Sequence, residues 1–90
     1  MDLNKTVELM NSSDYRERFQ AEYLQTKERY ERLKRFNNTI EAAELIGDEV
    51  KHDCPLSLLR RQQSVMGEYL HILELRAELE NVELEGLYEH

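Results

Sequence analysis

Side chains that could hold an anionic ligand gather before and within one predicted helix start. Ser12 and Ser13 precede it, and Tyr15 lies beside Arg16 and Arg18. The first amides of a helix attract anions, and cationic side chains nearby strengthen that attraction. An aromatic ring at the same place could stack on a base. The pattern therefore predicts a site for a small anionic ligand, with packing of Tyr15 into the core as the alternative.

Arg60 and Arg61 form a second cationic pair, close to the start of another predicted helix. A small anion needs only two or three cations and a helix N-terminus, so this pair is a second candidate site. The alternative is that both arginines lie on a solvated face.

Residues that could support metal binding or catalysis are also present. Glu68 and His71 have the E-x-x-H spacing of di-iron bundles, with Glu22 as a further ligand, but His71 falls nearly opposite the apolar side of its helix. His52 and Cys54 lack the two further ligands that zinc requires. No nucleophile elbow or Cys/His arrangement occurs. We therefore expect neither an enzyme nor a bound cofactor.

Charge and composition exclude several classes of protein. The chain has 90 residues and a net charge of −7, with four Lys or Arg against twelve Asp or Glu after residue 36. This surface disfavours binding of duplex nucleic acid. No apolar run approaches a membrane span, and residues 1–10 lack the apolar region of a secretory signal. A single cysteine fits a reducing compartment, so we expect an intracellular protein.

A seven-residue repeat predicts a long helix over residues 55–80. Leu58, Val65, Ile72 and Leu79 recur at this interval, and Pro55 suits the first turn. The helix would present one broad face, wider than a single partner helix can cover. That face consists of Leu58, Leu59, Gln62, Val65, Met66, Tyr69, Ile72, Leu73 and Arg76.

The first half of the chain predicts a second long helix, over residues 14–36. Asp14 and Glu17 have the form of a capping box. The stretch 37–39 weakens the helix, so a short extension over 39–46 is predicted separately, before a loop begins at Gly47. A short helix is predicted over 3–10, and 85–90 would form a loose tail.

These elements predict an all-α fold in one domain, residues 1–90. The two long helices match in length and would pair antiparallel as a helical hairpin. Two helices bury little surface, so self-association is expected to complete the core.

A family resemblance rests on residues spaced along both long helices, from about Val7 to Leu84. The residues concerned are 14–24, Arg29, Leu33, Cys54, Pro55, Leu58, Leu59, Gln62, Met66, Tyr69, Leu70, Leu73, Arg76 and Ala77. This pattern resembles the helical-hairpin domain of phage anti-CBASS and anti-Thoeris sponge proteins, small proteins of Firmicutes phages and prophages.

The resemblance implies a homo-oligomer, usually a hexamer, that sequesters cyclic nucleotide signals between subunits without cleaving them. The ligand would be a cyclic oligonucleotide or a cyclic ADP-ribose, bound in the cytoplasm of the infected host. Arg60 and Arg61 from neighbouring subunits would surround phosphates in a separate pocket. The alternative is a structural or regulatory phage protein that binds a protein partner. The first candidate ligand-binding residues are Ser12, Ser13, Tyr15, Arg16 and Arg18.

Overall fold

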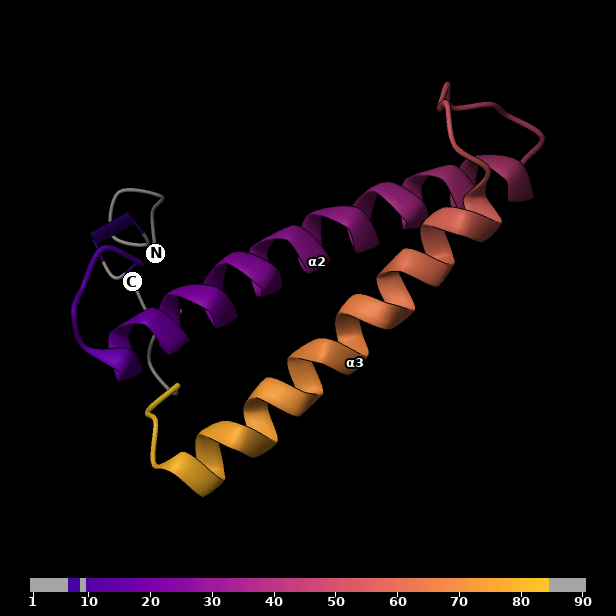
Figure 1. Ribbon diagram of the computed structural model, residues 1–90. Helices are drawn as coiled ribbons and strands as arrows, with labels where there is room; N and C mark the ends of the chain where they lie inside the picture. The colour runs from indigo at the N-terminus through magenta and orange to yellow at the C-terminus, as the bar shows by residue number, and fades with distance from the viewer. Residues whose placement is uncertain (1–6, 9, 85–90) are drawn as a thin grey trace.

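The computed structural model describes residues 7, 8 and 10–84, and two long helices dominate this part of the chain (Figure 1). Helix α2 is Tyr15–Leu45 and helix α3 is Leu56–Glu80. They lie side by side and antiparallel, joined by a loop over residues 46–55 (Figure 1). The described residues contain no strand, so the all-α prediction is confirmed for them.

Helix α2 begins where the capping residues predicted a start. The Asp14 side chain accepts a hydrogen bond of 2.9 Å from the Arg16 amide, and Glu17 lies in the first turn. At the other end Gly47 adopts a φ of 74°, and the Asp48 amide returns to the Ala43 carbonyl at 2.8 Å. The left-handed glycine ends the helix because other residues adopt that conformation at a cost.

The predicted interruption at residues 37–39 is wrong, because α2 passes through them without a break. Asn37 is fully buried, and its amide nitrogen donates to the Leu59 carbonyl at 3.2 Å and to Gln63 Oε1 at 3.1 Å. The Thr39 hydroxyl donates a hydrogen bond to the Arg35 carbonyl, one helical turn earlier. Packing against α3 therefore outweighs the low helix propensity of these residues.

Helix α3 begins after Pro55, which gives no side-chain cap, and ends at a left-handed cap residue. Pro55 precedes its first residue, and the Pro55 carbonyl accepts the amides of Leu58 and Leu59 at 3.1 and 3.2 Å. At the far end Asn81 is left-handed, with a φ of 58°, and the Val82 amide reaches the Ala77 carbonyl at 2.9 Å. The chain therefore turns sharply after α3.

The predicted N-terminal helix and tail lie largely outside the described residues. Val7, Glu8 and Met10 have helical backbone, and the Asn11 amide donates to the Val7 carbonyl at 3.1 Å. The remainder of the 3–10 prediction, and the whole 85–90 tail, are not described. No helix in the described part of the chain is long and apolar enough to cross a membrane.

The two helices pack through one seam on each, which we call the inner seams. Residues in both recur at alternating intervals of four and three, the spacing of an antiparallel coiled coil, and none of them is exposed. On α2 the inner seam is Phe19, Tyr23, Thr26, Tyr30, Leu33, Asn37 and Ile40. On α3 it is Leu59, Gln63, Met66, Leu70, Leu73, Ala77 and Glu80.

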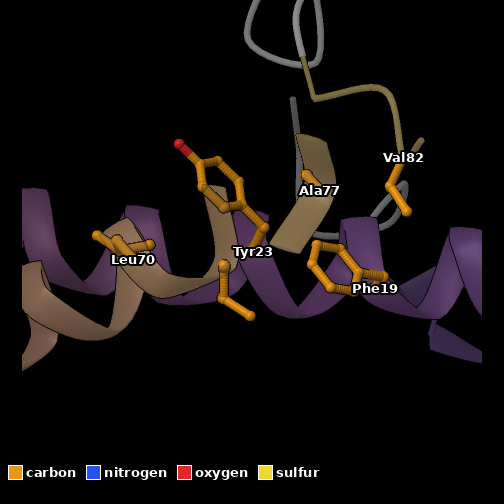
Figure 2. Close-up of a cluster of buried hydrophobic side chains, with 6 residues drawn as sticks. Phe19, Tyr23, Leu70, Ala77 and Val82 are labelled. Atoms are coloured by element: carbon orange, nitrogen blue, oxygen red, sulfur yellow. The ribbon is translucent and has the colours of Figure 1, made fainter. Parts of the chain in front are cut away.

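The main hydrophobic cluster lies toward the open end of the hairpin. Figure 2 shows Phe19 and Tyr23 of α2 against Leu70 and Ala77 of α3, with Val82 closing the cluster from beyond α3. The Tyr23 hydroxyl reaches the edge of the core and donates to Glu74 Oε2 at 2.6 Å. Full burial of one such apolar side chain contributes roughly 1.5–3 kcal/mol.

The seven-residue repeat that predicted α3 does not face α2. Leu58, Val65, Ile72 and Leu79 are 53%, 59%, 46% and 82% exposed. The broad face predicted from the sequence is thus divided between the inner seam and an uncovered stripe beside it. The hairpin is accordingly elongated, with a radius of gyration of 15.9 Å against about 12 Å expected for a compact domain of this length.

Gly67 lets the two helices approach closely. A Cβ at this position would lie 3.2 Å from Tyr30 Cε1 and 3.5 Å from the Tyr30 hydroxyl. The half-buried Tyr30 ring therefore packs over the glycine.

We expect Gly67→Ala to stabilise the protein by up to about 1 kcal/mol. Alanine gains about 1 kcal/mol of helix propensity, and the Tyr30 ring needs to move by only a few tenths of an ångström. Gly67→Leu should destabilise by roughly 1–3 kcal/mol, since the ring cannot clear a larger side chain. Urea unfolding followed by circular dichroism would measure both effects, and equal stabilities for the two variants would contradict this account.

Candidate functional site

A cluster of polar and aromatic side chains joins the two helices at the open end of the hairpin. The Tyr15 hydroxyl donates to Glu80 Oε1 at 2.7 Å and accepts from Arg76 Nη2 at 2.7 Å. Arg76 Nε also donates to Glu80 Oε2 at 2.9 Å. Tyr15, Arg76 and Glu80 therefore form a closed hydrogen-bonded triangle on the surface, and we call these residues with Phe19 the Tyr15 cluster.

Phe19 packs against both Arg76 and Tyr15 on the core side of the cluster. The Arg76 guanidinium lies 5.1 Å from the centre of the Phe19 ring, within the range of a cation–π interaction. The Tyr15 ring meets Phe19 edge to face, with centroids 6.1 Å apart. Phe19 is buried and Tyr15 is 46% exposed, so the cluster combines a buried aromatic ring that is held in place with a second ring that is accessible.

The charges of the cluster shift the titration of its members. Hydrogen bonds from Arg76 and Tyr15 lower the pKa of Glu80 below its ordinary value of 4.5. The hydrogen bond to Glu80 raises the pKa of Tyr15, and burial adds to that increase. Glu80 also raises the pKa of Arg76. The triangle is therefore most stable with Glu80 ionised and Tyr15 neutral.

The polar turn before α2 folds back onto the helix start. Ser12 Oγ accepts the Asp14 amide at 3.0 Å, and Arg18 Nη1 donates to the Ser12 carbonyl at 3.1 Å. The Asp14 carboxylate already accepts a hydrogen bond from the Arg16 amide. One of the free amides at the start of α2 therefore has a partner within the chain. Exposed side chains at Ser13 and Arg16 complete the predicted set.

Arg60 lies at the closed end of the hairpin, where it is tied to both helices. Its guanidinium donates to Gln63 Oε1 at 2.7 Å, to Asn38 Oδ1 at 3.0 Å and to Glu41 Oε1 at 3.1 Å. Arg61 is exposed. Since Arg60 contacts Asn38, the pair lies about 33 Å along α2 from Arg16. One chain does not bring the two predicted groups together.

Phe19, Arg76 and Glu80 were not among the predicted site residues, although Arg76 was placed on the broad face of its helix. The missing information was the register of the hairpin, which places Arg76 and Glu80 of α3 beside Tyr15 of α2. A pairing of the two inner seams could have supplied it, because such a pairing aligns the start of α2 with the end of α3.

The candidate metal ligands do not gather in the described residues. No group of three or more His, Cys, Asp or Glu there could hold a metal ion. Glu22 instead accepts a hydrogen bond of 3.0 Å from the Tyr69 hydroxyl. His52 Nδ1 contacts the Cys54 carbonyl in the loop.

A family model described as Sequestin matches residues 13–79, which is most of the chain. The chain belongs to the Sequestin family. This is the family of phage sponges for the cyclic nucleotide signals of CBASS and Thoeris immunity, so the resemblance predicted from the sequence is confirmed. Comparisons with curated proteins and with solved structures found no match.

The Sequestin match covers most of both candidate groups. Tyr15, Arg16, Arg18 and Arg76 lie inside it, as do Arg60 and Arg61, whereas Ser12 and Glu80 lie just outside its limits. The family consists of binding and sequestering proteins.

Protonation of Glu80 should weaken the hairpin in acid. A lowered pKa in the folded state means that this carboxylate stabilises the fold above its ordinary pKa of 4.5 and loses that contribution as the pH falls through the folded value. Glu80→Gln should therefore lose less stability than the natural protein between pH 5 and about pH 3. Urea unfolding across this range, with the exposed Glu78→Gln as control, measures the difference, and parallel curves for all three proteins would argue against the triangle.

Proposed function

We propose that this protein binds cyclic nucleotide signals of bacterial immunity at pockets between its subunits and holds them without cleavage. It would act in the cytoplasm of the infected host and keep the effector of the immune system inactive. The observation that carries the proposal is the Sequestin match over residues 13–79. The Tyr15 cluster adds a chemical reason, because it combines an accessible ring with cations.

Tyr15 would stack on a base, and the arginines around it would bind phosphate. Its ring is 46% exposed and packs edge to face with Phe19, so the ring is held in one position where a ligand can reach it. Arg76 is 47% exposed and currently shares its charge with Glu80. A phosphate would compete with Glu80 for Arg76 and would form charge-assisted hydrogen bonds of the same kind.

Arg16 and Arg18 would add positive charge beside the same ring, and Ser12 and Ser13 would offer hydroxyl and backbone groups. The whole protein carries a net charge of −7, so a local cluster of cations is needed to attract an anion. Arg16, Arg18 and Arg76 are the cations nearest to Tyr15, and residues 14–36 as a whole contain seven Lys or Arg against five Asp or Glu.

The pockets would form between subunits because Tyr15 and Arg76 are each nearly half exposed in one chain. A neighbouring copy would cover the ligand from the other side and exclude water, which strengthens each charged contact. Arg60 and Arg61 lie too far from Tyr15 to complete the same pocket within a chain. We propose that they line a second pocket with arginines of neighbouring subunits, in a homo-oligomer such as a hexamer.

A second candidate function is a structural or regulatory role through a protein partner. It is favoured by exposed apolar side chains away from the Tyr15 cluster, above all Leu45 and Ile46 at 81% and 79% exposure. An oligomer with no affinity for nucleotides would support this alternative.

Titration calorimetry against cyclic di- and trinucleotides and cyclic ADP-ribose isomers tests the proposal. The ligand is then recovered by heating the complex and identified by mass spectrometry. Tight binding with release of the intact molecule is the expected result and identifies the signal. Absence of binding across the panel, or recovery of a cleaved product, would overturn it.

Tyr15→Ala should weaken nucleotide binding by roughly 5- to 150-fold, because stacking of one base contributes about 1–3 kcal/mol. Tyr15→Phe keeps the ring and loses the hydroxyl, so it should retain most of the affinity. Phe36→Ala, which removes another exposed ring about 32 Å further along α2, serves as the control. Calorimetry with the identified signal measures all three, and unchanged affinity in Tyr15→Ala would remove Tyr15 from the site.

A further inference from the structure

Glu80, the last residue of α3, occupies the edge of Arg76 that an incoming anion would use. The Nε and Nη2 groups of an arginine form a fork that takes two oxygen atoms of a phosphate or a carboxylate. In this protein Nε donates to Glu80 Oε2 at 2.9 Å, and Nη2 donates to the Tyr15 hydroxyl at 2.7 Å. Both arms of the fork are therefore filled within the chain, and one of the two oxygen atoms carries negative charge.

The backbone that follows Glu80 is anchored at the open end of the hairpin. The Val82 side chain is buried in the hydrophobic cluster, and Gln20 Nε2 donates to the Glu83 carbonyl at 2.8 Å. The side chain of Glu80 itself is 35% exposed. An anion can therefore displace the carboxylate by rotation of that side chain, without opening the end of α3.

We propose that Glu80 is an internal competitor that keeps small anions off Arg76 and yields to an anion that also stacks on Tyr15. This inference rests on the proposed function and deepens it, because it names a residue that decides which anions occupy the site. Glu80 lies one residue beyond the Sequestin match over residues 13–79.

A small anion gains little by replacing Glu80. Inorganic phosphate would form with Arg76 the contacts that the carboxylate already forms, so the exchange of one anion for the other is nearly balanced. The displaced carboxylate stays nearby and repels the phosphate. The dissociation constant therefore rises for every anion that needs Arg76, and a weak binder no longer occupies the site.

A nucleotide differs from phosphate because it brings a base as well. Tyr15 is 46% exposed, and stacking of one base on such a ring strengthens binding by roughly 5- to 150-fold. This gain offsets the loss of the contact between Glu80 and Arg76. A stacking anion can thus occupy a site from which free phosphate is kept out.

Arg16 offers the displaced carboxylate a second cation. Hydrogen bonds from Arg76 and Tyr15 are the main causes that lower the pKa of Glu80, and the charge of Arg16 adds to them. The Arg16 side chain is exposed at the start of α2. Glu80 can therefore turn from Arg76 toward Arg16 when a ligand enters, and it can return when the ligand leaves.

Titration of the whole chain with inorganic phosphate at constant ionic strength tests the proposal. Phosphorus NMR measures the affinity, and the Arg76 Nε–H resonance in nitrogen NMR locates the bound phosphate. Glu80→Gln keeps the size of the side chain and removes its charge. It should bind phosphate about fivefold or more tightly than the natural protein, which is the effect of one unit charge at about 4 Å in water.

Two further variants show whether the gain comes from this contact. Glu78→Gln removes the same charge from an exposed position of the same helix and should bind phosphate as the natural protein does. Arg76→Gln/Glu80→Gln should lose the gain, because the freed fork is absent. Equal phosphate affinities in the natural protein and Glu80→Gln would overturn the proposal. A gain of the same size in either of the two further variants would also overturn it.

Circular dichroism checks that Glu80→Gln keeps its helices. If it does not, Tyr15→Phe takes its place, because it removes the hydroxyl that donates to Glu80 Oε1. Tyr15→Phe should bind phosphate more tightly than the natural protein, by less than the gain expected for Glu80→Gln, and an unchanged affinity would overturn the proposal.

The role of Glu80 and the sponge function fail in different measurements. If neither the natural protein nor Glu80→Gln bound any cyclic nucleotide, the sponge function would be overturned. The phosphate titration alone decides whether Glu80 keeps small anions off Arg76.

Discussion

The antiparallel contact between the two inner seams is the constraint on which the rest of the structure depends. Burial of Phe19 and Tyr23 against Leu70 and Leu73 holds the open end of the hairpin together. At the closed end, buried Asn37 donates to Leu59 and Gln63 across the seam, while its Oδ1 has no hydrogen-bond partner in the described residues. A buried amide of this kind disfavours any shift of one helix along the other, because a shift would leave its donors unpaired as well.

The register fixed by this contact creates the Tyr15 cluster from residues 61 to 65 positions apart in the chain. Arg76 is neutralised by Glu80 and rests on Phe19, so the cluster is satisfied without a ligand. An arginine held in this way is oriented before a phosphate arrives, which reduces the conformational entropy lost on binding. The Glu80 carboxylate that orients Arg76 would also repel the incoming anion. Affinity would therefore depend on how readily the ion pair between Arg76 and Glu80 separates.

Much of the fold could be predicted from the sequence because its signals are local. Asp14 and Pro55 mark helix starts, and Gly47 marks an end. The assignment of faces failed because α3 has two apolar stripes only one residue apart, and periodicity alone does not say which of them faces α2. The decision rests on size complementarity, since Gly67 and Ala77 leave room for large rings of α2. Arg76 and Glu80 were missed for the same reason, because only the register of the two helices places them beside Tyr15. The residues at the start of α2 could be found from their local pattern.

The position of the short loop has a consequence for the order in which the hairpin assembles. Residues near the loop over 46–55 are close in sequence as well as in space, so their pairing loses the least chain entropy and forms first. Pairing then proceeds toward the open end, where each new contact joins residues further apart. The Tyr15 cluster is the last part to close, and burial of the adjacent hydrophobic cluster then holds the open end together. The surface best suited to a ligand is therefore completed only after the two helices have paired along their whole length.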